Sequence, residues 1–318
     1  MSNQETAVTL GDYGKVAIKQ HFKKIDKHEA KVLKDKDPEE LHQMRVGIRR
    51  LRSAMIGFDQ AIALPKTATE KSAGDIGKVL GDLRDLDVLK LAIESKYLPN
   101  LPSDEQEYIA EVIKVISKKR KQAFKKVKST LKSKEYQEFK QGLENWLEKP
   151  KYKAIAATNI DLTLADLLLP QASKLLLHPG WLLGVEIVEG NITFNPNLSI
   201  DQVQAILETQ ENSLHSLRKE AKKTRYNMAL FTQFYDERYL EYLDKIADLQ
   251  EVLGEIQDCY VLREFLSEIF DKKLEKKLPS LIKQFSEKRY QKWQEWQDLQ
   301  QQFLDLKTRH EFLRAIIG

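Results

Sequence analysis

Residues 41–52 read LHQMRVGIRRLR, and this stretch decides how the rest of the chain is interpreted. On a helix with about 3.6 residues per turn, its side chains divide between two adjacent faces. One face is apolar and continues beyond the stretch, with Leu41, Met44, Ile48, Leu51, Met55 and Phe58. The other is a cationic stripe formed by His42, Arg45, Arg49 and Arg52. The pattern predicts an amphipathic helix that buries the first face and presents the second.

The same pattern occurs a second time in the chain. Residues 214–225 read LHSLRKEAKKTR, so that His215 and Arg218 stand where the first copy has His42 and Arg45. The offset of 173 residues that relates the two histidines also relates LGDLRDLDVL at residues 80–89 to LGEIQDCYVL at residues 253–262. Two pairs of motifs with one offset indicate an internal duplication. A solvated face is the usual reason for spaced cations, but a duplicated row of them favours an anionic ligand.

The composition favours a helical chain of about two domains' length. Among 318 residues there are only 13 Gly and 9 Pro, whereas Lys, Glu, Leu and Gln are abundant. We therefore expect an all-α fold over residues 1–318, with one helical bundle at 10–149, a linker at 150–158 and a second bundle at 159–318. The duplication further predicts that the halves are related by an approximate two-fold axis and that their basic helices face a shared central groove.

Hydrophobic periodicity and capping signals predict the individual elements. Asp37 is a good N-cap residue with Pro38 after it, and Ser199 with Gln202 resembles a capping box. The stretch VEIVEGNITF at residues 185–194 fits a small hairpin. The expected helices span residues 13–33, 38–61, 68–97, 103–131, 136–147, 164–178, 199–235, 237–270 and 277–306, with a short helix at the end.

The charge is unevenly distributed along the chain. The net charge is only +4, yet residues 114–140 contain eleven Lys or Arg against Glu135 and Glu138. Most of these lysines lie opposite the apolar face of their helix and are interpreted as solvated surface. Arg120 and Arg289 instead fall within apolar faces, and an inward arginine is costly unless an anionic group meets it.

Several classes of protein are disfavoured. The one cysteine, Cys259, allows no internal disulfide and fits a reducing compartment. Met1–Glu5 does not resemble a signal peptide, and no apolar run is long enough for a membrane span. We expect a cytoplasmic protein without membrane contact.

The motifs as they stand resemble those of the CHAD family, the conserved histidine α-helical domain. The resemblance is carried by His42-x-x-Arg45-Val46-x-x-Arg49-Arg50-Leu51-Arg52, by Leu80-Gly81-x-x-Arg84-Asp85-x-Asp87-Val88 and by their second copies. It implies two four-helix bundles with pseudo-two-fold symmetry around a basic channel that binds inorganic polyphosphate. The resemblance also suggests that the protein associates with polyphosphate granules. The second copy departs from the pattern, because Lys222 and Lys223 replace arginines, Gln257 replaces Arg84 and Tyr260 replaces Asp87.

A linear polyphosphate, or another polyanion, requires closely spaced cations, and the arginine fork can grip two phosphate oxygens at once. His42 and His215 fit either of two roles, a structural histidine or a phosphate ligand that strengthens when protonated. Tyr226 lies near the basic face and could donate its hydroxyl. The resemblance places Arg120 in a further basic segment. The candidate contacts are His42, Arg45, Arg49, Arg50, Arg52, Arg120, His215, Arg218, Lys219, Lys222, Lys223, Arg225, Tyr226 and Arg289.

Three alternatives were weighed against non-enzymatic polyphosphate binding. A metal site is disfavoured because His21 and His28 are too far apart along one helix to share an ion. An accessory domain of a metal-dependent phosphohydrolase is disfavoured because the only Glu-x-Glu, Glu105-Gln106-Glu107, lacks the following lysine and lies on an expected helix. Nucleic-acid binding is the most serious alternative, since basic stripes attract any polyanion. We expect no catalytic residue, metal or cofactor.

Overall fold

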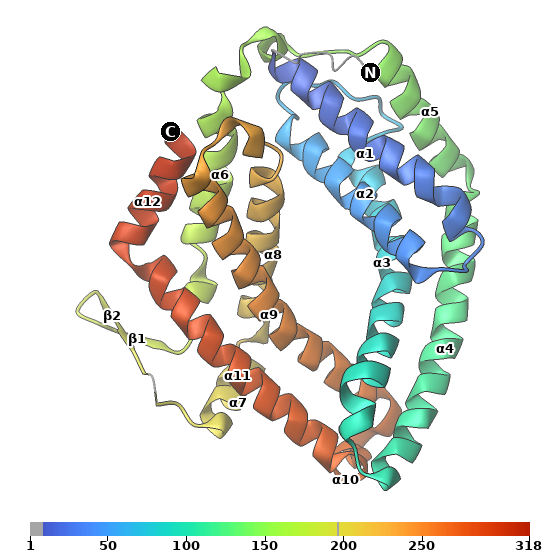
Figure 1. The fold of residues 1–318 in the computed structure, drawn as a ribbon, viewed down its shortest axis with the longest axis vertical. Helices are drawn as coiled ribbons and strands as arrows, with labels where there is room; N and C mark the ends of the chain where they lie inside the picture. Colours follow the sequence, from blue (N-terminus) through green and yellow to red (C-terminus); the bar gives the residue numbers. More distant parts are fainter. Residues whose placement is uncertain (1–8, 196) are drawn as a thin grey trace. The chain divides into compact units, whose positions relative to one another are not determined.

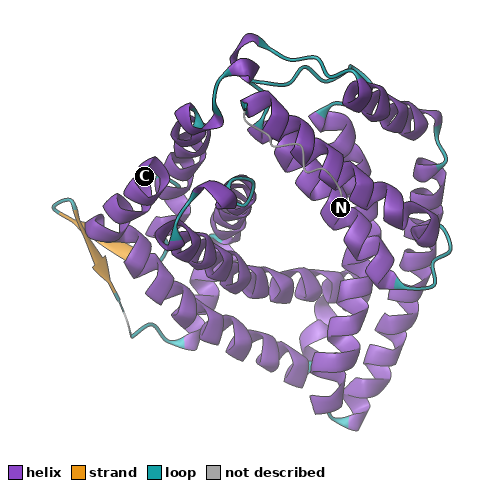
Figure 2. Cartoon of the chain, turned by 45° about the horizontal axis from the view of Figure 1, so that its top comes forward, coloured by secondary structure: helices purple, strands orange, loops and turns teal. Residues whose placement is uncertain are grey.

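The computed structural model describes residues 9–195 and 197–318, so Met1–Glu5, in which no signal peptide was expected, lies outside the described residues. The chain is all-α, as predicted. Within the described ranges a single two-stranded sheet accompanies the helices (Figure 2). No helix of these ranges is both long and apolar enough to cross a bilayer.

The chain divides into two compact units. Unit 1 comprises the residues up to Pro99 together with Ile109–Thr163, and unit 2 comprises Asn100–Tyr108 and Leu164–Gly318. The halves expected from the sequence, 10–149 and 159–318, assign residues 100–108 and 159–163 differently.

Unit 1 is built around the first basic helix. Its helices are α1 (Leu10–Val32), α2 (Pro38–Gly57), α3 (Glu70–Ala92, continued by a π-helical turn at Ile93–Tyr97), α4 (Ser103–Leu131, from Ile109 onward) and α5 (Lys134–Glu148). Asp37 caps α2 as predicted, accepting a hydrogen bond from the Glu39 backbone N–H at 2.9 Å. The six apolar residues of the α2 face are at most 3% exposed, which confirms the predicted inward side.

The α1 and α2 helices lie side by side (Figure 1). Gly47 makes this close approach possible, because a Cβ added there would lie 3.0 Å from Cγ1 of Ile25 on α1. The cationic side of α2 is thereby held next to the lysine-rich α1.

Unit 2 is built around the second basic helix. Its elements are α6 (Leu164–Leu176), β1 (Val185–Val188), β2 (Asn191–Phe194), α7 (Ile200–Thr209), α8 (Glu211–Met228), α9 (Glu237–Phe270), α10 (Leu274–Lys277), α11 (Pro279–Leu304) and α12 (Leu306–Ile317). The predicted hairpin is confirmed, and its two turn residues, Glu189 and Gly190, have positive φ angles of 49° and 81°, as a tight type I′ turn requires. The hairpin projects from the helices of unit 2 in Figures 1 and 2.

The prediction of one continuous helix over residues 199–235 was wrong. Ser199 and Gln202 do form a capping box, but the helix breaks at Gln210, whose φ and ψ are −120° and 17°. The two pieces have different partners, since α7 packs on α11 and α8 packs on α9. Tertiary packing therefore decides the break, and the local sequence shows no Gly or Pro that would signal it.

Glu105 explains why the start of α4 belongs to unit 2. Its side chain is 1% exposed, and its two carboxylate oxygens accept hydrogen bonds from the backbone N–H groups of Ser280 and Leu281, at 2.8 and 3.1 Å. The carboxylate thus caps the N-terminus of α11, where the helix dipole favours negative charge. The Glu-x-Glu considered for a phosphohydrolase lies on a helix, as expected, and its first carboxylate has this structural role.

Candidate functional site

The cationic stripe of α2 lies beside the buried apolar face and remains open to solvent. His42, Arg45 and Arg49 are half-buried, whereas Arg50 and Arg52 are exposed. The aliphatic parts of such side chains cover apolar surface while the charged ends stay accessible. The four residues of the predicted stripe, His42, Arg45, Arg49 and Arg52, all lie on α2 of unit 1, and Arg50 is a further cation of the same helix.

Two glycines of α3 leave room for the guanidinium groups of two arginines of α2. A Cβ added at Gly81 would lie 3.3 Å from Nε of Arg45, and one added at Gly74 would lie 3.4 Å from Nε and Cζ of Arg52. The guanidinium groups thus lie against bare helix backbone. Arg45 also has Asp85 near it, with 3.8 Å between Nη2 and Oδ1. Asp85 thus lies within ion-pair distance of this guanidinium group.

Unit 2 repeats this local arrangement. A Cβ added at Gly254 of α9 would lie 3.3 Å from Nε and 3.2 Å from Nη2 of Arg218 on α8. Nε of Arg218 is buried and has no hydrogen-bond partner among the described residues. The pairs Arg45–Gly81 and Arg218–Gly254 stand at the same offset of 173 residues, so the duplicated motifs produce the same contact in each unit.

His42 and His215 are surrounded by positive charge. The pKa of His42 is lowered, first by burial and then by the nearby Arg84. The pKa of His215 is lowered by burial and by Lys219 and Arg218. In both units burial is the main cause that disfavours protonation of the imidazole, and the neighbouring cations, whose charge an anionic ligand would offset, add to it.

Arg84 lies near the candidate contacts of unit 1, although it was not among the residues selected from the sequence. Its charge acts on both His42 and Glu39, which places it beside the N-terminal part of α2. The signal was present in the motif, because Arg84 follows Gly81 by one helical turn and therefore shares its face of α3.

The remaining predicted residues of α8 have unequal surroundings. Lys223 forms an ion pair with Glu220, with 3.3 Å between Nζ and Oε2, and Glu220 also accepts a hydrogen bond from Gln171 at 2.5 Å. Lys219 is exposed, whereas Lys222, Arg225 and Tyr226 are half-buried. The stripe of unit 2 is thus partly neutralised by acidic neighbours on its own helix.

Arg120, a candidate contact from the sequence, has carboxylate partners within unit 1. Its Nη atoms donate to both carboxylate oxygens of Asp35 at 2.7 Å, and its Nε donates to Asp87 at 2.6 Å. The anionic groups that an inward arginine requires are therefore supplied by unit 1 itself. A polyanion would have to displace two carboxylates to reach this guanidinium.

Arg289, the other inward arginine, is buried. Its side chain is 3% exposed and lies on α11 among buried aromatic residues, as the sequence predicted. Burial lowers its pKa, and the negative charges of Glu208 and Glu211 act in the opposite direction. The Arg289 side chain is therefore closed to a polymeric ligand, whereas Arg120 is half-buried.

The placement of possible metal ligands and of the tryptophans bears on the metal-site and nucleic-acid alternatives. Within residues 9–195 and 197–318, no three His, Cys, Asp or Glu side chains are grouped as metal ligands would be. The four tryptophans, Trp146, Trp181, Trp293 and Trp296, are at most 4% exposed. They are packed in the hydrophobic interiors and offer no surface on which nucleic-acid bases could stack.

Comparison with known proteins now defines the class. The CHAD domain family matches residues 16–267, which is most of the chain, and the protein therefore belongs to the CHAD family. The fold is similar to the crystal structure of the CHAD domain from the plant Ricinus communis, with a TM-score of 0.56 and 22% identity over 97% of this chain and 92% of that chain. It is also similar to PptA from Streptomyces chartreusis, with a TM-score of 0.64 and 13% identity over 93% of this chain and 100% of that chain. The comparison with curated proteins gives no match.

Proposed function

We propose that this chain binds inorganic polyphosphate without catalysis, through the cationic stripes of α2 and α8. The observation that carries the proposal is an arginine packed against a glycine of the neighbouring helix, Arg45 on Gly81 and Arg218 on Gly254, which occurs in both units near a histidine whose pKa is lowered by burial and by neighbouring cations. Preformed rows of cations suit a ligand with a negative charge on every monomer and no bases to read. The CHAD family membership supports this ligand class.

The proposed set of contact residues differs from the set expected from the sequence at three positions. Arg120 and Arg289 are left out because of their carboxylate partners and burial, respectively. Arg84 is added because its charge reaches His42. The proposed set is His42, Arg45, Arg49, Arg50, Arg52 and Arg84 in unit 1, and His215, Arg218, Lys219, Lys222, Lys223, Arg225 and Tyr226 in unit 2.

Charge reversal tests the proposal. Replacing Arg45, Arg49, Arg218 and Lys222 together by glutamate is expected to weaken polyphosphate binding by at least about 100-fold, because four phosphate contacts become repulsive. The measurement is calorimetric titration with medium-length polyphosphate, with circular dichroism to confirm helicity. The matched control replaces Lys118, Lys121, Lys125 and Lys128 of α4, which are all exposed, by glutamate. Equal losses in both variants would move the site away from the stripes.

We further propose that one polymer engages both stripes, as the shared groove expected from the sequence implies. Two linked binding surfaces raise the apparent affinity for a ligand long enough to reach both. Long polyphosphate is therefore expected to bind much more tightly per site than pyrophosphate, and reversal of one stripe alone is expected to remove most of this advantage. If the two single-stripe variants retain the length dependence, each stripe binds its own polymer.

Nucleic acid remains the second candidate ligand because the electrostatic attraction is shared. The burial of all four tryptophans argues against it for single strands. Because the proposed ligand is polyphosphate, we also propose that the protein is cytoplasmic and associates with polyphosphate granules. Imaging of the tagged chain beside stained polyphosphate checks both.

A further inference from the structure

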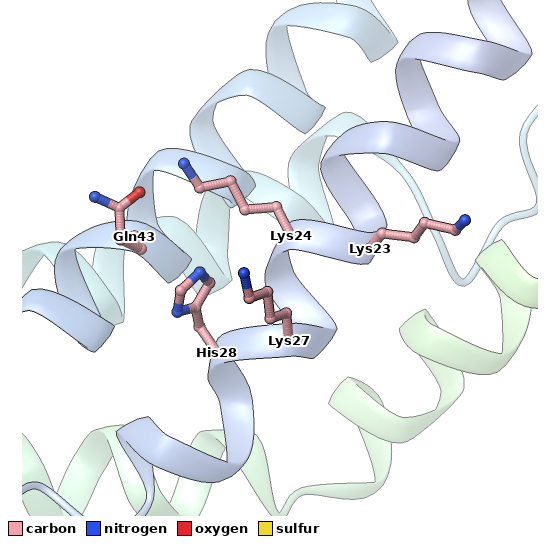
Figure 3. Close-up of a pocket in the computed structure, with 5 residues that line it drawn as sticks. All are labelled: Lys23, Lys24, Lys27, His28 and Gln43. Carbon is pink, nitrogen blue, oxygen red and sulfur yellow. The ribbon is translucent and has the colours of Figure 1, made fainter. Parts of the chain in front are cut away.

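An open pocket in unit 1 brings together lysines of α1 that the stripe of α2 does not include. It is lined by Lys23, Lys24, Lys27, His28 and Gln43, and it lies where α1 packs on α2. Figure 3 shows the side chains of Lys24 and Lys27 on the same side as His28 and Gln43, whereas Lys23 points away. Two ammonium groups therefore converge on one hollow.

Among the described residues of unit 1, these lysines have no carboxylate partner. None of Lys23, Lys24 and Lys27 has a carboxylate oxygen within 4.0 Å among the residues that the structure describes. The two acidic neighbours are already engaged. Glu40 accepts hydrogen bonds from Nδ1 of His28 at 2.5 Å and from Lys31 at 2.8 Å, and Glu39 accepts one from the Gln43 amide.

The positive charges of α2 act on Lys24 in this pocket. Burial lowers the pKa of Lys24, and the next largest cause is the positive charge of Arg50 on α2. The negative charge of Glu39 acts in the opposite direction, and Arg49 and Lys27 add smaller lowering effects. The pKa of the buried His21, beneath this surface, is lowered to about 4 by burial, Arg50 and Lys24. Like charges that act on one another in this way repel, and an anion bound among them would relieve the repulsion.

Unit 2 has no equivalent lysine surface. The α6 helix, which packs on α8 as α1 packs on α2, contains only Lys174, whereas α1 contains six lysines. The feature is therefore an addition to unit 1 and does not follow from the duplication.

We propose that Lys24, Lys27 and Arg50 form a phosphate subsite that carries the polyanion path from α2 onto α1. The inference rests on the proposed function and extends it to a second helix of unit 1. Ammonium groups act as point charges with freely rotating donors, which suits successive phosphoryl groups of a flexible linear chain. The ligand class is a run of adjacent phosphates, and pyrophosphate is the smallest probe that reproduces it.

The test compares two double variants of the full chain. Lys24→Gln with Lys27→Gln removes the proposed contacts, whereas Lys15→Gln with Lys19→Gln removes the same charge from other positions of α1. Polyphosphate affinity is measured by calorimetry at several salt concentrations. The first variant is expected to lower the slope of log affinity against log salt by about 1.4, which corresponds to two lost phosphate contacts on a single-stranded polyanion. The second is expected to keep the wild-type slope.

A second readout locates the ligand. His28 lines the pocket, so pyrophosphate is expected to shift its ring resonances in the wild-type NMR spectrum and not in the Lys24→Gln, Lys27→Gln variant. Equal slopes in both double variants, or unchanged His28 resonances, would overturn the subsite while polyphosphate binding by the wild type stands. Absence of wild-type binding would instead overturn the proposed function.

Discussion

Gly81 contributes to the site although it carries no side chain, because Arg45 occupies the space that a Cβ would take. Gly81→Ala is expected to displace the guanidinium and weaken polyphosphate binding about threefold to tenfold, a loss of the order of one charge-assisted hydrogen bond. The free energy of unfolding is expected to rise or stay unchanged, because alanine is the better helix former by about 1 kcal/mol. Calorimetric titration and urea unfolding measure the two quantities.

The control for Gly81 is the same substitution in an Arg45→Ala background. If the glycine acts by positioning Arg45, the substitution has no effect on affinity once the guanidinium is absent. A loss of affinity that persists in that background would show that Gly81 matters only for helix packing.

His42 and His215 predict a pH dependence of binding. Their pKa values are lowered in the unliganded protein, mainly by burial and by neighbouring cations, and a bound polyanion would raise them. Binding should therefore take up protons and tighten as the pH falls below the ordinary histidine pKa of about 6.5. Titrations at pH 7.5 and 5.5 measure the effect, and the variant with glutamine at both positions should lose it. Unchanged dependence in that variant would assign the protons elsewhere.

His21 predicts a pH dependence of stability. It is 8% exposed, and its pKa is lowered to about 4. The unfolded chain binds a proton near pH 6.5 that the folded chain does not bind until pH 4, so stability falls between these values, by about 3 kcal/mol in total. Urea unfolding at pH 7 and 4.5 checks this for wild type and His21→Leu, which should lose less on acidification. The exposed His310→Leu is the control, and an equal acid loss in all three chains would contradict the assignment.

At the scale of elements, the Arg120 ion pairs join α4 to the α1–α2 connection and to α3, through Asp35 and Asp87. Arg120→Gln leaves two partly buried carboxylates unpaired, so we expect a loss of about 2–3 kcal/mol in the free energy of unfolding. Polyphosphate affinity should remain within about twofold of wild type, because the guanidinium makes no proposed contact. Unfolding and calorimetry on one preparation separate the roles, and a large loss of affinity in a folded variant would return Arg120 to the site.

The amphipathic elements could be predicted from sequence, because their signal is local. The periodicity of residues 41–58 identified the buried face of α2, and Asp37 and Ser199 marked helix starts that the structure confirms. The break at Gln210 could not be predicted, since it depends on which helices α7 and α8 contact. The partners of Arg120 could not be predicted from the sequence either, because Asp35 lies 85 residues away along the chain.

At the scale of the whole molecule, the distribution of charge matters more than its sum. A net charge of +4 would not indicate a polyanion ligand, but the cations of α2 and α8 are gathered in rows and those of α1 adjoin one of them. The rows could be predicted from the repeat. The α1 contribution could not, because Lys24 and Lys27 join the site only through helix packing.

Competition between polyphosphate and DNA tests the central claim most directly. The full chain is bound to labelled duplex DNA near physiological salt and titrated with unlabelled polyphosphate at equal phosphate concentration, and the reverse experiment follows. The account predicts that polyphosphate displaces the DNA and that DNA fails to displace polyphosphate, because rows of cations without exposed tryptophans favour a bare phosphate chain. Displacement of polyphosphate by DNA at equal charge would contradict it.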